Sequence, residues 1–151
     1  MTAPLYVRPV ESEADWQAAQ HIRTVVFIEE QACPPKEEWD GYDDSSRHVL
    51  GWLDDTPVAT ARWRTVSHGE RLVAKLERFA VLAPYRGQGH GRQLVLRVME
   101  DARRAGFDEQ MLHAQAHLEA FYASLGFAAT ERRFVEAGIP HVEMVQRLGA
   151  N

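Results

Sequence analysis

The stretch that decides the fold of this chain reads Pro84-Tyr85-Arg86-Gly87-Gln88-Gly89-His90-Gly91-Arg92. The apolar run Phe79–Leu82 precedes it, and an amphipathic segment begins at Gln93. This order predicts a strand, a glycine-rich turn and the first turn of a helix. Glycines let backbone N–H groups converge without interference from a Cβ, and a helix N-terminus adds unpaired N–H donors and the positive end of its dipole. The stretch therefore predicts a site for a phosphate-bearing ligand.

The composition is that of one ordinary globular domain spanning residues 1–151, with 45% hydrophobic and 26% charged residues. The apolar runs are too short to cross a bilayer, and the N-terminus shows no secretion signal. Cys33 is the single cysteine, which excludes an intrachain disulfide and fits a reducing cytoplasm. Cysteine and histidine clusters at metal-ligand spacing are missing, and a net charge of −5 argues against nucleic acid. We therefore expect a cytoplasmic domain without metal, membrane or nucleic-acid partners.

Hydrophobic spacing along the chain predicts a mixed sheet with helices packed on it. The expected strands cover residues 5–10, 48–53, 58–66, 72–82, 111–114, 127–135 and 141–148. The expected helices cover a segment that Ser12 caps and that ends before Pro34, then residues 88–105 and 118–125, and residues 37–46 form a loop. The helix over 88–105 should bury a stripe of Leu94, Val95, Val98, Met99 and Ala102. This order of elements indicates a layered α/β or α+β domain.

Two common nucleotide sites do not fit the glycine turn. A P-loop needs a lysine and then Ser or Thr after its last glycine, whereas Arg92 and Gln93 follow Gly91. A dinucleotide fingerprint belongs to a βαβ unit with an acidic residue about 20 positions further on. Here the preceding strand lies in an expected antiparallel meander. A turn that uses glycine for geometry alone is the remaining alternative.

The turn also occurs in a wider pattern. The motif Arg86-x-x-Gly89-x-Gly91, with Phe79-Ala80-Val81 before it and Phe121-Tyr122-Ala123-Ser124-Leu125-Gly126-Phe127 after it, resembles the GNAT superfamily of acyl-CoA-dependent N-acetyltransferases. The resemblance covers nearly the whole chain. It implies a mostly antiparallel twisted sheet with splayed central parallel strands and helices on both faces.

Three further segments, 27–34, 114–117 and 138–144, resemble the ElaA-like branch of that superfamily. Pro35 and the insert Glu37-Glu38-Trp39 depart from the branch pattern. The loop that holds them is expected to border the acceptor.

The resemblance implies acetyl-CoA as a co-substrate. Its pyrophosphate would bind the amides of the glycine turn, and its pantetheine arm would add to the strand edge at Phe79 and Val81 as a half-strand. The implied cofactor-binding residues are Phe79, Ala80, Val81, Arg86, Gly87, Gln88, Gly89, His90, Gly91, Arg92 and Gln115.

The resemblance indicates one catalytic residue, Tyr122, and the chemistry of the reaction requires a base as well. Tyr122 would donate a proton to the CoA sulfur as it leaves; its alternative is a tyrosine of an aromatic core. Glu77 or His117 would take the proton of the attacking amine, whose pKa is about 10 in a lysine-like group. Glu77 shares a strand face with Phe79. Its alternative is an ion pair with Arg78 or Lys75, and that of His117 is a structural hydrogen bond.

The acceptor pocket is expected to be lined by Phe27, Glu29, Glu30 and His141. The function implied is transfer of acetyl from acetyl-CoA to a primary amine, small or peptidyl, by direct attack in a ternary complex. The alternatives are a non-catalytic acyl-CoA-binding or regulatory domain, and an interaction domain with a purely structural turn. An exposed strand edge could pair with a second copy to form a homodimer.

Overall fold

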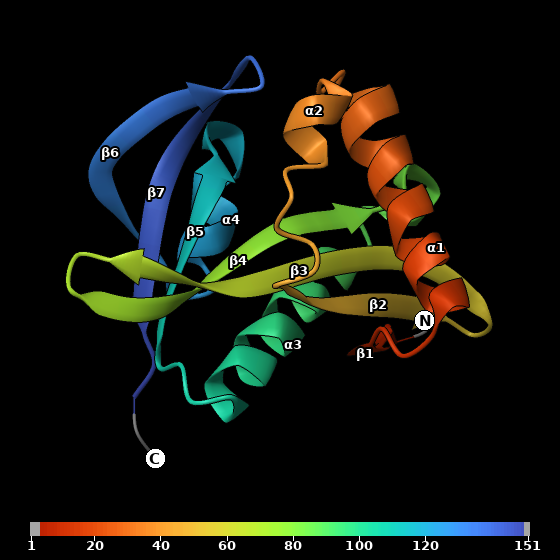
Figure 1. Ribbon diagram of the computed structural model, residues 1–151, viewed down its shortest axis with the longest axis horizontal. Helices are drawn as coiled ribbons and strands as arrows, with labels where there is room; N and C mark the ends of the chain where they lie inside the picture. Colours follow the sequence, from red (N-terminus) through yellow and green to blue (C-terminus); the bar gives the residue numbers. More distant parts are fainter. Residues whose placement is uncertain (1–3, 150–151) are drawn as a thin grey trace.

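A seven-stranded sheet runs through the centre of the protein in a computed structural model that describes residues 4–149 (Figure 1). Its strands lie in the order β1-β2-β3-β4-β5-β7-β6. All neighbours are antiparallel except β4 and β5. The strands are β1 (Tyr6–Pro9), β2 (Arg47–Leu53), β3 (Thr56–His68), β4 (Arg71–Val81), β5 (Glu109–Gln115), β6 (Ala128–Glu136) and β7 (Ile139–Arg147).

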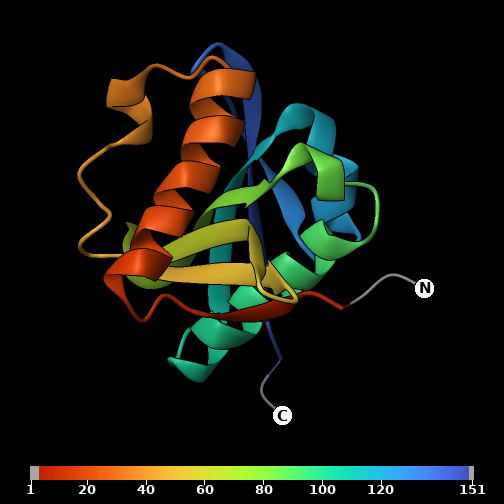
Figure 2. The same ribbon diagram turned by 90° about the vertical axis from the view of Figure 1, so that its right-hand side faces the viewer.

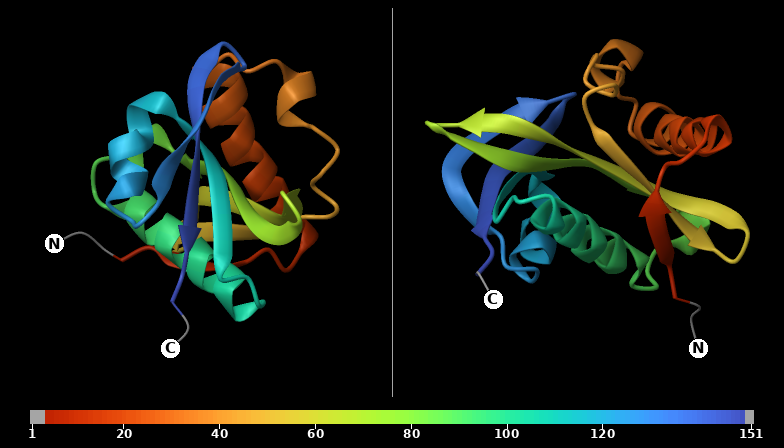
Figure 3. Two further views of the ribbon diagram at one scale, coloured as in Figure 1. Left: turned by 90° about the vertical axis from the view of Figure 1, so that its left-hand side faces the viewer. Right: turned by 60° about the horizontal axis from the view of Figure 1, so that its bottom comes forward.

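Helices cover both faces of this sheet (Figures 2 and 3). The helical elements are α1 (Glu13–Arg23), the π-helical η1 (Thr24–Glu30), α2 (Pro35–Glu38), the 3₁₀ turn η2 (Ala83–Tyr85), α3 (His90–Arg104), the 3₁₀ turn η3 (Ala116–Leu118) and α4 (Glu119–Ala123). Successive strand residues point to opposite faces. Val49 therefore packs in the core beneath α3, and its neighbour Leu50 packs in the core beneath α1.

The two long helices follow the sequence signals closely. The Ser12 hydroxyl accepts a hydrogen bond from the Asp15 amide at 3.1 Å, so the predicted cap of α1 is present. The predicted stripe of α3 is buried throughout. This helix begins at His90 rather than 88, because Gly89 adopts a left-handed conformation at φ +85° and caps it. The segment expected as a loop over 37–46 contains the end of α2, which Pro35 starts at its first position.

The hairpin between β6 and β7 is tighter than expected. Its strands extend to Glu136 and from Ile139, which pair with each other. Ala137 and Gly138, the two residues between them, have φ of +52° and +76°. Two left-handed residues in a two-residue turn match the twist of antiparallel strands. Glu136 lies just before this turn on β6 and His141 lies shortly after it on β7, so both are close to the hairpin end of the sheet.

The parallel strands β4 and β5 separate after a short contact (Figure 1). They pair at Ala74 with Gln110 and at Lys75 with Met111, and beyond these residues the described parts of the two strands diverge. The fold class predicted from the resemblance, a mostly antiparallel sheet with splayed parallel strands, is confirmed. Within residues 4–149, no helix has the length and apolar character to span a membrane.

Candidate active site

The glycine turn offers a row of free backbone donors. Gly87 and Gly89 have φ of +78° and +85°, a region that residues with a Cβ seldom adopt. Within the described chain, the six amides from Gly87 to Arg92 donate to no acceptor; the first bonded amide is that of Gln93, to the Gly89 carbonyl at 3.2 Å. These donors lie at the positive end of the α3 dipole. They form a ready site for an anion.

Gly91 gives an independent indication of a ligand. Its φ is not in the left-handed region, and a Cβ placed on it would meet no atom within 4 Å. Neither backbone conformation nor packing therefore requires glycine, although glycine in a helix costs about 0.5–1 kcal/mol relative to alanine. Space kept open at a row of unpaired amides fits the close approach of a bound phosphate.

The two arginines of the turn differ. Arg86 donates to the Val81 carbonyl at 2.7 Å and pairs with Glu30 at 2.9 Å, so it braces the turn against the end of η1. Arg92 is exposed and forms no ion pair with the described residues. Arg92 is the cation of the turn that is free to meet a phosphate.

A bulge in β4 shapes the strand edge next to the turn. The register between β3 and β4 shifts between Thr60 and Arg62, and Arg78 opposite has φ +59°. Such strain in a non-glycine residue is typical of functional sites. Phe79, Ala80 and Val81 follow directly, on a strand that β5 has left. An extended ligand arm could pair with this open edge.

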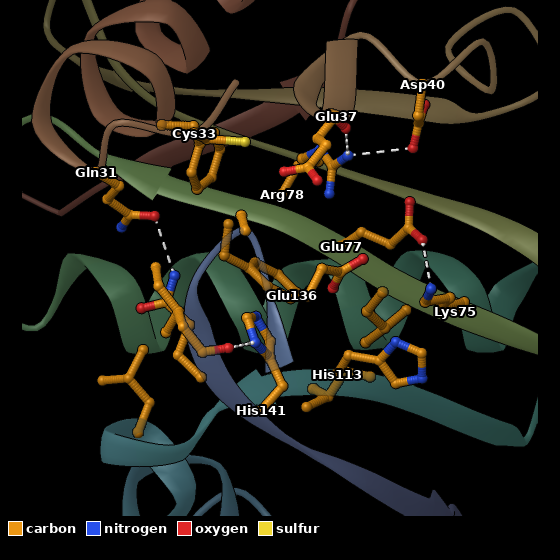
Figure 4. Close-up of a pocket in the computed structure, with 18 of the residues that line it drawn as sticks. Gln31, Cys33, Glu37, Asp40, Lys75, Glu77, Arg78, His113, Glu136 and His141 are labelled. Atoms are coloured by element: carbon orange, nitrogen blue, oxygen red, sulfur yellow. Dashed lines mark hydrogen bonds and ion pairs between the residues drawn. The ribbon is translucent and has the colours of Figure 1, made fainter. Parts of the chain in front are cut away.

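The divergence of β4 and β5 opens a cavity of about 410 Å³ (Figure 4). Its lining comes from the segment after α1, from β3, β4 and β5, from η3 and α4, and from the β6–β7 hairpin. The lining residues are Phe27, Gln31, Cys33, Glu37, Asp40, Tyr42, Arg64, Lys75, Leu76, Glu77, Arg78, Phe79, Leu112, His113, Gln115, Leu118, Tyr122, Glu136, Ala137, Ile139 and His141.

Tyr122 is a buried residue of the cavity lining. The side chain is 7% exposed, and its ring lies 6.2 Å from Phe79 and 5.1 Å from Phe121. Burial raises the pKa of the Tyr122 phenol well above its usual value. The hydroxyl therefore stays protonated at neutral pH and can act as a hydrogen-bond donor.

Glu77 is held in a dense network of cations. Arg62 contacts its Oε2 at 2.6 Å, and Arg64 and Lys75 contact its Oε1 at 3.2 and 3.1 Å. Burial alone would raise the pKa of Glu77, but Arg62, Lys75 and Arg64 together lower it below its ordinary value. Glu77 is therefore ionised, with both oxygens already engaged.

The loop before β2 extends the same network. Asp40 accepts from Arg62 at 2.6 Å and from Arg78 at 3.1 Å. Burial opposes ionisation of Asp40, yet Arg62 and Arg78 lower its pKa to about 2. Arg78 also pairs with Glu38 at 3.0 Å. These contacts tie the loop to β3 and β4 and close one wall of the cavity.

Two histidines, His113 and His141, line the cavity in different surroundings. Burial, with Lys75 and Arg132 nearby, lowers the pKa of His113 to about 4, so this ring is neutral and weakly basic. The Nδ1 of His141 lies 2.7 Å from the Ile139 carbonyl oxygen. Its ring stacks on Phe134 with centroids 5.6 Å apart and an angle of 13°.

Carboxylates without a partner are few in this cavity. Within residues 4–149, the side chains of Glu37 and Glu136 form no ion pair or hydrogen bond, whereas Asp40 and Glu77 are saturated. The Cys33 thiol also lines the cavity. Burial, with Glu38 and Glu37 nearby, raises the pKa of this thiol. A raised pKa leaves this thiol protonated and unreactive.

The structure brings together only part of the predicted acceptor site. Phe27, Glu77, Tyr122 and His141 line the cavity. His117 is exposed on η3 and lies outside the lining, because the 3₁₀ turn after β5 directs it away. Glu29 and Glu30 are also exposed and outside it.

Glu30 lies outside because it pairs with Arg86 at 2.9 Å, next to the glycine turn. Gln115, expected at the cofactor, bonds to Gln31 at 3.0 Å across the cavity wall.

Most of the other cavity residues were not predicted from the sequence as site residues; Lys75, Arg78, His113 and Glu136 are charged or titratable examples. Alternation along β4 could have indicated Lys75, which shares a face with Glu77. Phe79 lies on the opposite face, against the expectation from the sequence, because the bulge at Arg78 breaks the alternation. Alternation along β5 could likewise have indicated His113, two residues before Gln115. No pattern in the neighbouring sequence indicates the bulge at Arg78. The same is true of the position of Glu136 opposite the segment between η1 and β2.

Comparison with known proteins agrees with this geometry. The sequence profile described as "Acetyltransferase (GNAT) domain" matches residues 19–148. YyaT of Bacillus subtilis is 36% identical over 148 residues, which cover 96% of this chain and 97% of that protein. ElaA of Escherichia coli is 35% identical over 133 residues, which cover 87% of this chain and 86% of ElaA.

Solved structures show the same similarity. The crystal structure of E. coli ElaA matches with a TM-score of 0.81 and 32% identity, covering 95% of this chain and 99% of that one. An acyl-CoA N-acyltransferase from Pseudomonas aeruginosa matches with a TM-score of 0.82 and 31% identity, covering 96% and 99%. A Bacillus acetyltransferase in complex with CoA, at 17% identity, shares the fold.

Proposed function

The chain belongs to the GNAT acetyltransferase family, and we propose that it transfers an acetyl group from acetyl-CoA to a primary amine bound in the β4–β5 cavity. One observation carries the proposal: the open edge of β4 joins the free amides of the glycine turn to a cavity that contains Tyr122. A phosphate-bearing thioester and an acceptor would then meet at one place.

The residues of the turn and strand fit acetyl-CoA. The amides from Gly87 to Arg92 and the side chain of Arg92 would hold the pyrophosphate. The strand edge at Phe79 and Val81 would hold the pantetheine arm. When bound, acetyl-CoA would supply the acetyl group as a thioester to the cavity that contains Tyr122.

Tyr122 supplies the acid in this proposal. Attack by the amine forms a C–N bond and breaks the C–S bond, so negative charge develops on sulfur. The protonated phenol, raised in pKa by burial, donates a hydrogen bond and then its proton to that sulfur. Transfer takes place in a ternary complex, because the reactive thiolate that an acetyl-enzyme would require is not formed at Cys33.

The two bases expected from the sequence are placed differently. His117 faces solvent outside the cavity. Glu77 lies in the cavity as a carboxylate with lowered pKa, held by Arg62, Arg64 and Lys75. In the proposal Glu77 keeps these cations in place and contributes little basicity of its own.

The rival function is binding of acyl-CoA without catalysis. Substitution of Tyr122 by Phe separates the two: we expect kcat to fall by about 10²–10³-fold, because the acid is lost, with the Kd for acetyl-CoA nearly unchanged. Acetyl-CoA binding is measured by calorimetry, and turnover is measured by release of free CoA thiol with a panel of primary amines.

Tyr6→Phe is the matched control, since Tyr6 is 62% exposed on β1 and its substitution should change neither quantity. Unchanged turnover in Tyr122→Phe would remove Tyr122 from the mechanism. Saturable acetyl-CoA binding without turnover of any amine by the native protein would favour the rival.

A further inference from the structure

We propose that His141 is the base that takes the proton of the acceptor amine, through an Nε2 atom whose lone pair is directed into the cavity. The inference rests on the proposed function and adds the residue that makes the amine nucleophilic. It is carried by the geometry of the β6–β7 hairpin, whose residues are far in sequence from the glycine turn.

The hydrogen bond of His141 fixes its tautomer. Its Nδ1 lies 2.7 Å from the Ile139 carbonyl oxygen, and a carbonyl oxygen only accepts. The proton of the neutral ring is therefore on Nδ1, and the lone pair is on Nε2. A base held in this tautomer needs no rearrangement before it accepts a proton.

Phe134 fixes the plane of the ring. Phe134 and His141 are paired across β6 and β7, and their rings are stacked, 5.6 Å apart and at 13°. Figure 4 shows the imidazole pointing from β7 into the cavity. Tautomer and orientation are thus both set by the hairpin before an acceptor binds.

Three other basic groups of the cavity, Glu77, Asp40 and His113, are less suited to the role. Both oxygens of Glu77 are engaged by cations, and those of Asp40 are engaged by Arg62 and Arg78. The Nε2 of His113 is buried without a hydrogen-bond partner among the described residues. His141 therefore combines an open lone pair with access to the acceptor.

Charged groups around His141 support proton transfer in the required direction. The titratable groups that share the cavity with it are Glu136 on β6, His113 on β5, Arg64 on β3, Lys75, Glu77 and Arg78 on β4, Tyr122 on α4, and Cys33, Glu37, Asp40 and Tyr42 in the segment between η1 and β2. Glu136 lies two residues after Phe134, so it occupies the same sheet face as a diagonal neighbour of His141.

The unpaired carboxylate of Glu136 would stabilise the imidazolium that His141 becomes.

The protons balance as follows. The ammonium form of the acceptor gives one proton to Nε2 of His141, which later releases it to solvent. The free amine attacks the thioester carbonyl, a C–N bond forms and the C–S bond breaks. Tyr122 gives its proton to the sulfur, and the nitrogen, on becoming an amide, loses a second proton that restores the phenol.

His141→Asn is the decisive substitution. The asparagine amide can take the place of Nδ1 and keep the hydrogen bond to Ile139, but it has no equivalent of the Nε2 base. We expect kcat/KM at pH 7 to fall by about 100-fold, with the Kd for acetyl-CoA and the circular dichroism spectrum unchanged. The dependence of kcat/KM on pH that deprotonation of this base would give the native enzyme should disappear.

Two controls and a rescue sharpen the test. His117→Asn, on the exposed η3 turn, should leave rate and pH profile unchanged. Added imidazole should restore part of the activity of His141→Ala. In ¹⁵N spectra of the native protein, His141 should show the Nδ1–H tautomer at neutral pH.

The outcomes are separable. Full turnover of His141→Asn with an unchanged pH profile, or an Nε2–H tautomer in the native protein, would overturn the role of His141 alone. Loss of the pH-dependent step in His113→Asn, with that step intact in His141→Asn, would move the role to His113. A native protein that binds acetyl-CoA but acetylates no amine would overturn the proposed function and this role together.

Discussion

The glycine turn and the acceptor cavity are built on opposite principles. The turn is one continuous stretch whose polar groups are backbone amides, six of them free from Gly87 to Arg92. The cavity is assembled from side chains of distant segments, and its charges are locked together around Glu77 and Asp40. A site made of backbone tolerates changes of side chain but not of backbone conformation. A site made of paired side chains is sensitive to each charge.

The difference also separates two tasks. Every acetyl-CoA carries the same phosphates, so a local device suffices to hold it. The acceptor must be oriented against the thioester, and orientation needs groups fixed from several directions. Under the proposed function, the hairpin that holds His141 and the cations that hold Glu77 would supply these fixed groups.

The largest expected effect comes from Gly89→Glu. The substitution places a residue with a Cβ at φ +85° and a negative charge where phosphate binds, which costs several kcal/mol in like-charge contact. We expect the Kd for acetyl-CoA to rise by about 1,000-fold or more, measured by calorimetry. Gly89→Asn is the matched control, because asparagine tolerates the left-handed region, and it should retain most of the affinity. Native affinity in Gly89→Glu would leave the turn without a role in binding.

Glu77→Gln tests the paired charges of the cavity. Removal of one charge leaves Arg64 and Lys75 without an ion-pair partner among the described residues and leaves Arg62 with Asp40 and Asp43 alone. The loss from a broken buried pair is about 3 kcal/mol of unfolding free energy at pH 7. Glu131→Gln, an exposed change on β6, should stay within about 0.5 kcal/mol. Urea unfolding of both variants at pH 7 gives the comparison, and equal stabilities would show that the cation network is dispensable.

The pH dependence of this effect follows from the lowered pKa of Glu77. A carboxylate whose folded-state pKa lies below its unfolded value contributes stability above the unfolded pKa of about 4.5 and loses it as pH falls through the folded value. Between pH 7 and pH 3 the native protein should therefore lose more stability than Glu77→Gln. A parallel loss in the two proteins would contradict this assignment.

Gly91→Ala has the smallest expected effect and the most specific one. Alanine fits without contact in the free protein and should stabilise α3 by about 0.5–1 kcal/mol. The same methyl group would occupy space kept for the phosphate, so the Kd for acetyl-CoA should rise by about 10-fold. Leu96→Ala, an exposed change on the same helix, should leave the Kd unchanged. Higher stability together with unaltered binding would mean that the space at Gly91 has no ligand.

Several elements could be read from sequence because their causes are local. The Ser12 cap, the stripe of α3 and the glycine turn each depend on residues within a few positions of one another. The observed ends of helices and strands differ from the predicted ends by a few residues where left-handed residues set them, as at Gly89 and at the Ala137-Gly138 turn. The resemblance supplied the splay of β4 from β5, which hydrophobic spacing alone does not encode.

The acceptor site was decided by the tertiary structure. The bulge at Arg78 places Glu77 on the opposite face of β4 from Phe79, and the approach of Arg62 and Arg64 from β3 turns it from a candidate base into an anchored carboxylate. His117 and Glu30 have suitable chemistry in the sequence, yet a 3₁₀ turn and a pairing with Arg86 place them elsewhere.

By itself, the sequence determined the glycine turn, because backbone donors and glycine conformations follow from neighbouring residues. Only the tertiary structure decided how the side chains of the cavity are arranged. Which lone pair is free, which charge is paired and which ring faces the cavity all depend on residues brought together from separate strands.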